Sequence, residues 1–409
     1  MTDIMKGVRI LEVAEHAFVP TASALLADWG AEVIKVEHVE RGDAMRGLIS
    51  SGVMASMGGD VHVLLEHANR GKKSVGIDLT TPPGVEVVYK LAAMCDVFLT
   101  NKLPAVRTKL HIEVDDIRAH NPNIIYVAGT GGGERGPEAD KGGYDFLSYW
   151  CRAGSAMGCT APDAESLVVQ PGPGYGDSIG GMAIAGGIMG ALFHRERTGE
   201  ALTVDVSLLS VGLWAMGPAL ALSLQLGMPW RPPPAGSGSG GPSNPLVGTY
   251  RTQDGGFIAM SCLQGFHYWP GACRAIGRED LVADERFASH ELLASNAGVA
   301  RTILASVFAS APLAAWRERL AAFDGQWSVA QDTLEVVSDP QVEANGYLLE
   351  TLNAAGVPFR LVTAPVQFGG TPATPKRAPE FNEHRDEVLA SVGYSTDSIL
   401  ELAVEGVVA

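Results

Sequence analysis

The sequence predicts a doubly wound α/β fold with a second, smaller domain, and three observations lead to this prediction. The chain has 409 residues, which is about two to three times the usual length of one domain. Short apolar runs alternate with helix-like segments through residues 8–128, as in a parallel sheet with crossover helices. A stretch rich in Pro, Gly and Ser at 230–245 is typical of a linker between domains.

Five apolar runs are expected to form the strands of the large sheet. They lie at residues 8–13, 32–37, 74–79, 96–100 and 123–128. A short helix at 21–29 should end at Gly30. A second helix should begin after Thr81, because Pro82 and Pro83 occupy its first turn, where a missing N–H group costs little.

The second half of the chain begins with a long helix from 178 to about 197, rich in glycine, so another backbone can approach it closely. A β segment at 250–260 and amphipathic helices then indicate a small α+β domain. The predicted division is a large domain from 1–200 and 331–409, a long helix and linker at 201–245, and a small domain at 246–330.

The composition excludes several kinds of partner and site. A net charge of −16 repels phosphate backbones and anionic lipid, so neither nucleic acid nor a membrane surface is an expected partner. The five cysteines are scattered and no HExxH motif is present, so no metal site is expected. The N-terminus lacks an apolar export signal, which favours a cytoplasmic location.

Residues 206–230 carry no charge and meet the length criterion for a membrane-spanning helix. Polar residues and glycines interrupt the segment, and no second span of this kind follows. We therefore favour a buried helix in a large core.

Asp177 is the candidate catalytic residue, because it stands among glycines at the start of the long helix. One interpretation is a helix N-cap, in which the carboxylate accepts hydrogen bonds from the first turn. The other is a nucleophile, since Gly174, Gly176, Gly180 and Gly181 leave room for a bulky ligand and carboxylates form covalent intermediates. The pattern alone leaves both open.

Basic residues gather near the predicted strand ends despite the negative net charge. They are Arg41, Arg46, Arg70, Lys72, Lys73, Lys102, Arg107 and Lys109. Ligands of open α/β sheets bind at these ends, where cations can meet phosphates. A solvated charged surface gives the same pattern. Two GxGxxG strings, at 131–136 and 236–241, are more typical of turns than of a dinucleotide fingerprint.

A set of short motifs, in order along nearly the whole chain, resembles class III CoA transferases, a family that extends to α-methylacyl-CoA racemases. Examples are LLADWGAEVIKVEHVERGDAMR, NRGKKSVGIDL and GDSIGG. The matching segments are 7–20, 25–46, 69–79, 95–104, 121–137, 142–146, 176–181, 191–200, 338–342 and 378–394. The resemblance implies a Rossmann-like large domain and an interlocked homodimer, in which 206–226 would be buried.

The resemblance assigns the catalytic aspartate to Asp177 and so favours the nucleophile over the N-cap. It also implies a set of contacts with coenzyme A. These are Ala17, Phe18, His38, Ile77, Asp78, Leu79, Asn101, Lys102, Leu103, Lys109, Gly142, Gly143, Tyr144 and Asp145. No metal is implied, and residues 236–241 resemble the glycine loop that closes over the acyl site in formyl-CoA transferase.

Three positions depart from the family pattern. Ala17 replaces a glutamine common in relatives, and His38 replaces an arginine, so phosphate pairing is expected to shift to Lys102, Lys109 or another cation. Tyr144 stands where racemases carry a GHD histidine. A phenol with a pKa of about 10 is a poor base for α-proton exchange, which favours transfer over racemisation.

The resemblance therefore implies transfer of CoA from an acyl-CoA donor to a small carboxylic acid through an aspartyl-CoA thioester. Two alternatives remain at this stage. The first is a 2-methylacyl-CoA racemase, which would need another base in place of the missing histidine. The second is a non-catalytic acyl-CoA binding protein.

Overall fold

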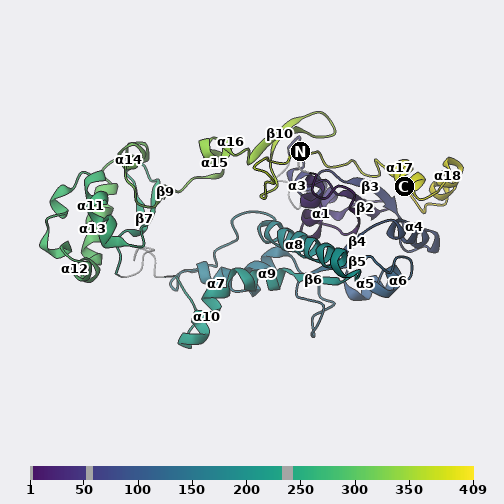
Figure 1. The fold of residues 1–409 in the computed structure, drawn as a ribbon, viewed down its shortest axis with the longest axis horizontal. Helices are drawn as coiled ribbons and strands as arrows, with labels where there is room; N and C mark the ends of the chain where they lie inside the picture. The colour runs from purple at the N-terminus through teal and green to yellow at the C-terminus, as the bar shows by residue number, and fades with distance from the viewer. Residues whose placement is uncertain (1–2, 52–58, 233–242) are drawn as a thin grey trace. The chain divides into compact units, whose positions relative to one another are not determined.

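The computed structural model describes residues 3–51, 59–232 and 243–409 and divides into two compact units (Figure 1). The first unit comprises Met1–Met157, Val168–Trp230 and Pro340–Ala409. The second comprises Gly158–Leu167 and Arg231–Asp339. Each unit is described by itself below.

The first unit is built around a sheet of six parallel strands in the order β3-β2-β1-β4-β5-β6. The strands are β1 (Arg9–Val13), β2 (Glu32–His38), β3 (Lys73–Ile77), β4 (Val97–Thr100), β5 (Ile125–Thr130) and β6 (Thr203–Ser207). This is the doubly wound order, and it confirms the parallel sheet predicted from the sequence. The sequence did not reveal β6, an edge strand that is partly exposed.

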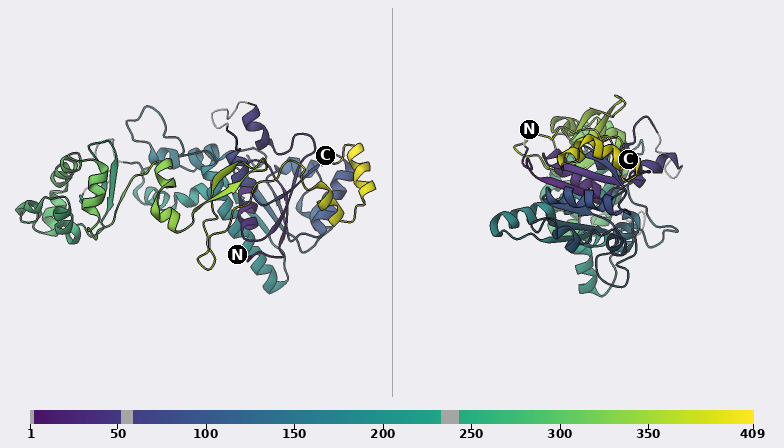
Figure 2. Two further views of the ribbon diagram at one scale, coloured as in Figure 1. Left: turned by 90° about the horizontal axis from the view of Figure 1, so that it is seen from above. Right: turned by 90° about the vertical axis from the view of Figure 1, so that its right-hand side faces the viewer.

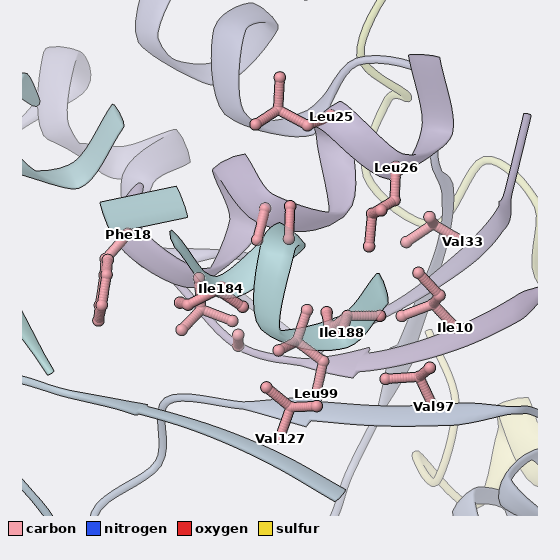
Figure 3. Packing of buried hydrophobic residues seen from close by; sticks show 14 of the residues in the cluster. Ile10, Phe18, Leu25, Leu26, Val33, Val97, Leu99, Val127, Ile184 and Ile188 are labelled. Atoms are coloured by element: carbon pink, nitrogen blue, oxygen red, sulfur yellow. The ribbon is translucent and has the colours of Figure 1, made fainter. Parts of the chain in front are cut away.

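Helices cover both faces of this sheet. On one face, α1 (Phe18–Asp28) and α8 (Tyr175–Thr198) pack side chains such as Leu26 and Ile188 against Ile10 and Leu99 of the strands (Figure 3). The other face is covered by α4 (Pro82–Ala93), α6 (Val114–Arg118), α17 (Arg385–Ser391) and α18 (Thr396–Val404). As predicted, α4 begins directly after Thr81, with prolines in its first turn, and the structure adds that the Thr81 side chain caps the helix.

Shorter helices connect these elements. They are η1 (Ala44–Arg46), α2 (Gly47–Ser50), α3 (Val63–Asn69), α5 (Pro104–Lys109), the π-helical segment η3 (Phe146–Arg152), α7 (Ser155–Cys159) and α16 (Pro340–Ala344). Among the described helices, α8 alone is long and apolar enough to cross a membrane by length and composition. In this structure α8 is instead part of the core, where Ile184 and Ile188 are fully buried.

The expectation of one buried helix at 206–230 is wrong for the single chain. After β6, the segment forms α9 (Leu208–Ala215) and α10 (Gly217–Leu226), which meet at an angle of 67°. None of the residues of α10 is buried, and Trp214 and Leu224 are each 86% exposed. Pro218 in the first turn of α10 explains the break, because proline cannot continue a preceding helix.

The C-terminal segment returns to the β3 edge of the sheet. It first forms the antiparallel hairpin β10 (Leu348–Leu352) and β11 (Pro358–Val362). Its last residues then pair with the end of β3, where Ala409 N–H donates to Gly76 O at 3.1 Å. Figure 2 shows the C-terminal helices beside this edge.

The second unit has a three-stranded antiparallel sheet in the order β7-β8-β9 and a core of its own. The strands are β7 (Val247–Arg251), β8 (Phe257–Ser261) and β9 (Trp327–Val329). The helices are α11 (Gly265–Ala275), η4 (Glu279–Leu281), η5 (Glu285–Phe287), α12 (His290–Ser295), α13 (Ala297–Phe308), α14 (Leu313–Leu320) and α15 (Thr333–Val337).

Candidate active site

Asp177 lies in the first turn of α8, two residues after the helix begins at Tyr175. The residue at the N-cap is Gly174, which has the left-handed φ of 67° that glycine tolerates best. The N-cap interpretation of Asp177 is therefore wrong. The Asp177 carboxylate does not cap the helix.

The glycines around Asp177 serve close packing. A Cβ atom at Gly176 would lie 2.7 Å from the ring of Tyr149, and one at Gly180 would lie 2.3 Å from the ring of Phe18. The expectation that these glycines leave room for a ligand is wrong at both positions, because aromatic side chains fill the space. They hold the first turn of α8 between η3 and the start of α1.

The Asp177 side chain makes no hydrogen bond or ion pair with any of the residues that the structure describes. Burial raises its pKa, and the nearby charge of Asp145 raises it further, to about 7. A partly buried carboxylate without a countercharge is costly to ionise. Such perturbed groups are typical of functional sites.

Asp145 connects three parts of the site. Its Oδ1 accepts from Phe146 N–H at 2.7 Å, and its Oδ2 accepts from Gln170 Nε2 at 3.1 Å and from Gly176 N–H at 3.2 Å. The preceding glycines allow this approach, since Gly143 lies against Gly131, where an added Cβ would be 2.8 Å from the Gly143 Cα. The 142–145 segment therefore sits beside the helix that carries Asp177.

Two histidines, not identified by sequence reasoning, lie near these residues. The ring of His16 packs edge-on against exposed Tyr144, with 5.6 Å between ring centroids. His67 Nε2 lies 3.2 Å from Ser178 Oγ, and burial together with the charge of Arg70 lowers the pKa of His67 to about 4. Isolated histidines carry no motif, so only the fold could bring them here.

A cavity of about 180 Å³ lies at the carboxyl edge of strands β1 to β4, where ligands of open α/β sheets bind. Its lining includes the predicted residues His38, Ile77, Asp78, Leu79 and Lys102. It also includes Glu15 and Arg41, which the sequence did not single out as contacts. The structure thus brings together side chains from four separate strand ends.

The two cations of this cavity are held by one carboxylate. Glu15 Oε2 lies 2.6 Å from Lys102 Nζ, and Glu15 Oε1 lies 3.7 Å from Arg41 Nη2. Asn101 fixes the backbone of Glu15 from both sides, at 3.1 Å and 2.7 Å. Lys109 is exposed at the end of α5 and does not line the cavity.

Most other members of the basic group serve the structure. Arg70 pairs with Asp28, Arg46 with Glu37, and Arg107 with Glu134, and Lys72 is buried beside Glu12. These residues are therefore neither phosphate-binding cations nor a solvated surface, the two interpretations of the sequence pattern. Near the strand ends, buried ion pairs and ligand-facing cations look alike in a sequence.

The remaining predicted contacts lie around these two regions. Leu103 is the N-cap of α5 and follows Lys102 directly. Ala17 is the N-cap of α1 and Phe18 is its first residue. Both belong to residues 14–20, the loop after β1 together with the first three residues of α1, which we call the 14–20 turn. This turn links the two regions, because Glu15 lines the cavity while Phe18 lies on α8. The predicted glycine loop at 236–241 lies outside the described residues.

A family model described as CoA-transferase family III matches residues 5–385. The chain belongs to this family. It is 30% identical, over 97% of both chains, to the (R)-2-hydroxy-4-methylpentanoate CoA-transferase of Clostridioides difficile. It is 29% identical, over 98% of this chain and 96% of the other, to the cinnamoyl-CoA:phenyllactate CoA-transferase of Clostridium sporogenes.

A solved CAIB/BAIF family protein from Brucella suis has the same fold, with a TM-score of 0.79 at 26% identity over 95% of this chain and 99% of the other. The protein is thus a family III CoA-transferase, an enzyme of the acyl-CoA:carboxylate class. This excludes the alternative of a non-catalytic binding protein. Within the described residues, no group of three or more His, Cys, Asp or Glu side chains could hold a metal ion.

Proposed function

We propose that this family III CoA-transferase moves CoA from an acyl-CoA donor to a free carboxylic acid through a covalent thioester at Asp177. The observation that carries the proposal is the carboxylate itself. It stands in the first turn of α8 without a hydrogen-bond partner among the described residues, and its pKa is raised to about 7. A carboxylate of higher basicity is a better nucleophile.

The proposed reaction balances without water, metal or net proton transfer. An Asp177 oxygen attacks the thioester carbonyl, and the C–S bond breaks. CoA departs as the thiolate, and the acyl group is now joined to Asp177 in a mixed anhydride. The thiolate then attacks the Asp177 carbonyl, which releases the donor acid and forms aspartyl-CoA. The acceptor carboxylate repeats both steps in reverse and regenerates the Asp177 carboxylate.

We propose that the nucleotide part of CoA binds in the cavity at the strand ends. A phosphate entering it would compete with Glu15 for Lys102 and Arg41, the two cations that Glu15 holds. Arg41 could therefore take the role of the arginine that His38 replaces. Charge-assisted contacts of this kind are the strong ones.

We further propose 2-hydroxy acids with a branched or aromatic substituent as acceptors. Both relatives described above are named for such acids. A panel of acyl-CoA donors, including cinnamoyl-CoA, crossed with carboxylic acids and read by mass spectrometry would identify the pair. Higher turnover with simple unbranched acids than with 2-hydroxy acids would contradict this substrate class.

The covalent step is tested by incubating the enzyme with a donor and no acceptor. Intact mass spectrometry should show an added CoA moiety, and hydroxylamine should convert Asp177 to a hydroxamate within its peptide. Asp177→Asn should show no adduct, whereas Asp115→Asn, at an exposed acid on α6, should load normally. A CoA adduct at any other residue would overturn the assignment.

We also propose a homodimer, interlocked as in the family resemblance. The exposed apolar surface of α9 and α10, including Trp214, Leu224 and Leu226, supports this, because large exposed apolar surfaces are typical of interfaces. Light scattering at micromolar concentration should give twice the 42.9 kDa chain mass. A monomer under these conditions would contradict the proposal.

A further inference from the structure

Four charged side chains lie fully buried behind the 14–20 turn: Glu12, Lys35, Asp43 and Lys72, here called the buried charge cluster. Lys35 Nζ lies 2.8 Å from Glu12 Oε1 and 2.7 Å from Asp43 Oδ2. Lys72 Nζ lies 2.9 Å from Glu12 Oε2. Two cations and two anions balance, so the cluster carries no net charge.

Each charged group of the cluster except Glu12 also holds the backbone of the 14–20 turn. Lys35 Nζ donates to Ala14 O at 2.9 Å. His16 N–H donates to Asp43 Oδ1 at 2.9 Å, and Lys72 Nζ donates to Pro20 O at 2.9 Å. The turn is therefore held at its beginning, its middle and its end by side chains from outside it.

The turn has little means of holding this shape itself. His16 has a φ of 65°, a left-handed conformation that costs a non-glycine residue about 1–2 kcal/mol. Ala17, at the N-cap of α1, has no side chain that could accept a hydrogen bond. The conformation therefore depends on contacts made by the rest of the protein.

Phe18 connects the 14–20 turn to α8, the helix that carries Asp177. The Phe18 ring lies directly on Gly180, three residues beyond Asp177 on α8. Any shift of the turn moves Phe18 on this surface and moves His16 against Tyr144. A displacement of about 1 Å beside a reacting group can reduce rates roughly a hundredfold.

We propose that the buried charge cluster positions the 14–20 turn for CoA transfer, with Lys72 as the residue that holds its last part, at Pro20 in the first turn of α1. The proposal rests on the proposed function, because it assigns the cluster to the step at Asp177. Buried ion pairs often contribute little net stability compared with apolar residues. The cluster makes three hydrogen bonds to the backbone of the 14–20 turn, so we assign it a role in positioning this turn rather than in overall stability.

The test compares Lys72→Met with the double variant Glu12→Gln/Lys72→Met. The single change leaves the cluster with one uncompensated negative charge and should lower the melting temperature. The double change restores neutrality and should recover much of that loss, but it does not restore the bond to Pro20 O. Lys73→Met is the matched control, since Lys73 pairs with Glu32 and Glu387 on the partly exposed side of β3.

We expect the double variant to form aspartyl-CoA from cinnamoyl-CoA, or the fastest donor of the panel, roughly ten- to a hundredfold more slowly than the parent. Lys73→Met should load at the parent rate. Hydrogen–deuterium exchange of a peptide spanning the turn should be faster in the double variant and unchanged in the control. Loading and exchange at parent rates in a folded double variant would overturn the proposal.

A milder variant covers the case in which Lys72→Met does not fold. The single Ser23 hydroxyl proton has two acceptors within reach, the Glu12 carboxylate and, at 3.1 Å, Pro20 O. Ser23→Ala therefore removes a contact between the cluster and the end of the turn without changing charge. A three- to tenfold slower loading is expected, and an unchanged rate would overturn the proposal. Absence of any adduct in the parent enzyme would instead contradict the proposed function. The hydrogen–deuterium exchange of the turn would then still test whether the cluster positions it.

Discussion

Two kinds of buried carboxylate stand on either side of the 14–20 turn, and they differ in what surrounds them. Behind the turn, burial alone would raise the pKa of Glu12, but the adjacent Lys35 and Lys72 hold it below its usual value. In front of the turn, the part of the chain that the structure describes places no cation within ion-pair distance of Asp177, and burial together with Asp145 raises its pKa to about 7. The more deeply buried carboxylate is thus the one whose pKa is lowered, because two lysines lie within ion-pair distance of it.

The two regions have different roles, because the paired carboxylate holds structure and the unpaired carboxylate is placed to react. A carboxylate that is paired and hydrogen-bonded in a region of low dielectric is held in one position. The two lysines beside Glu12 keep this carboxylate ionised at neutral pH. An unpaired carboxylate in such a region is reactive but destabilising.

The largest expected effect comes from removing the unpaired carboxylate. Asp177→Asn should reduce CoA transfer roughly a thousandfold or more, because the amide cannot form the anhydride or the thioester. CoA binding, measured by calorimetry, should stay near the parent value. Turnover above a few per cent of the parent, after deamidation to Asp has been excluded by mass, would contradict the nucleophile assignment.

Stability should respond to the two carboxylates with opposite signs. Glu12→Gln leaves two buried lysines with one carboxylate and should cost about 3–5 kcal/mol. Asp177→Asn should stabilise the protein by about 1–3 kcal/mol at pH 8, because ionised Asp177 is the costly form. Urea unfolding of both variants measures this, and destabilisation by Asp177→Asn at pH 8 would contradict the contrast.

The stability gain of Asp177→Asn should depend on pH. The folded-state pKa of Asp177 is raised to about 7 from an ordinary value of 3.8. The parent protein therefore recovers stability as pH falls from 8 towards 4, since the folded state takes up the proton first. The advantage of the Asn variant should shrink over this range, and repeated unfolding curves at pH 8, 6 and 4 would show it.

The pH profile of activity should report the same group. The reactive form of Asp177 is the carboxylate, so kcat/KM should rise with pH and level off above about 7. Asp145→Asn removes the second cause of the raised pKa and should move the midpoint to lower pH. A profile that is flat between pH 5 and 8 would contradict the assignment.

The sequence predicted the sheet well because its signals are local. Five of the six strands are short apolar runs, and Thr81 with two prolines begins α4 as expected. The helices α9 and α10 were missed as separate elements, since an uncharged segment gives no sign of a bend. Whether such a segment is buried depends on what packs against it, which composition does not state.

The candidate site was predictable only where a motif marked it. GDSIGG located Asp177, but no local pattern separates a catalytic carboxylate from an N-cap, and the resemblance decided between them. Lys72 and Lys102 looked equivalent in sequence, yet one is fully buried beside Glu12 and the other lines a cavity. That distinction depends on packing between strands far apart in the chain.

A moderate effect is expected at the cavity where Glu15 holds two cations. Arg41→Ala and Lys102→Ala should each weaken CoA binding roughly tenfold, the value of one charge-assisted bond. Lys109→Ala, at an exposed residue outside the cavity, should have less effect. Calorimetry at low and high salt measures the CoA affinity of all three variants. Unchanged affinity in the Arg41 and Lys102 variants would place the phosphates elsewhere.

The smallest expected effect is a null result that separates transfer from racemisation. Racemisation must exchange the α-proton of a 2-methylacyl-CoA and needs two acid/base groups, whereas CoA transfer needs neither. The family resemblance assigns Tyr144 to the position of the racemase histidine, and the imidazole beside Tyr144 belongs to His16, whose ring centroid lies 5.6 Å away. His67 is unsuitable as a base at neutral pH because its pKa is lowered to about 4.

In heavy water without an acceptor, the enzyme should therefore leave the α-carbon of a 2-methylacyl-CoA unlabelled while it still forms aspartyl-CoA. His16→Ala should not change this absence of label. Mass spectrometry of the recovered thioester gives the answer. Rapid deuteration that depends on both Asp177 and His16, without any enzyme-bound CoA, would falsify the transferase mechanism and show that His16 has replaced the missing histidine of a racemase.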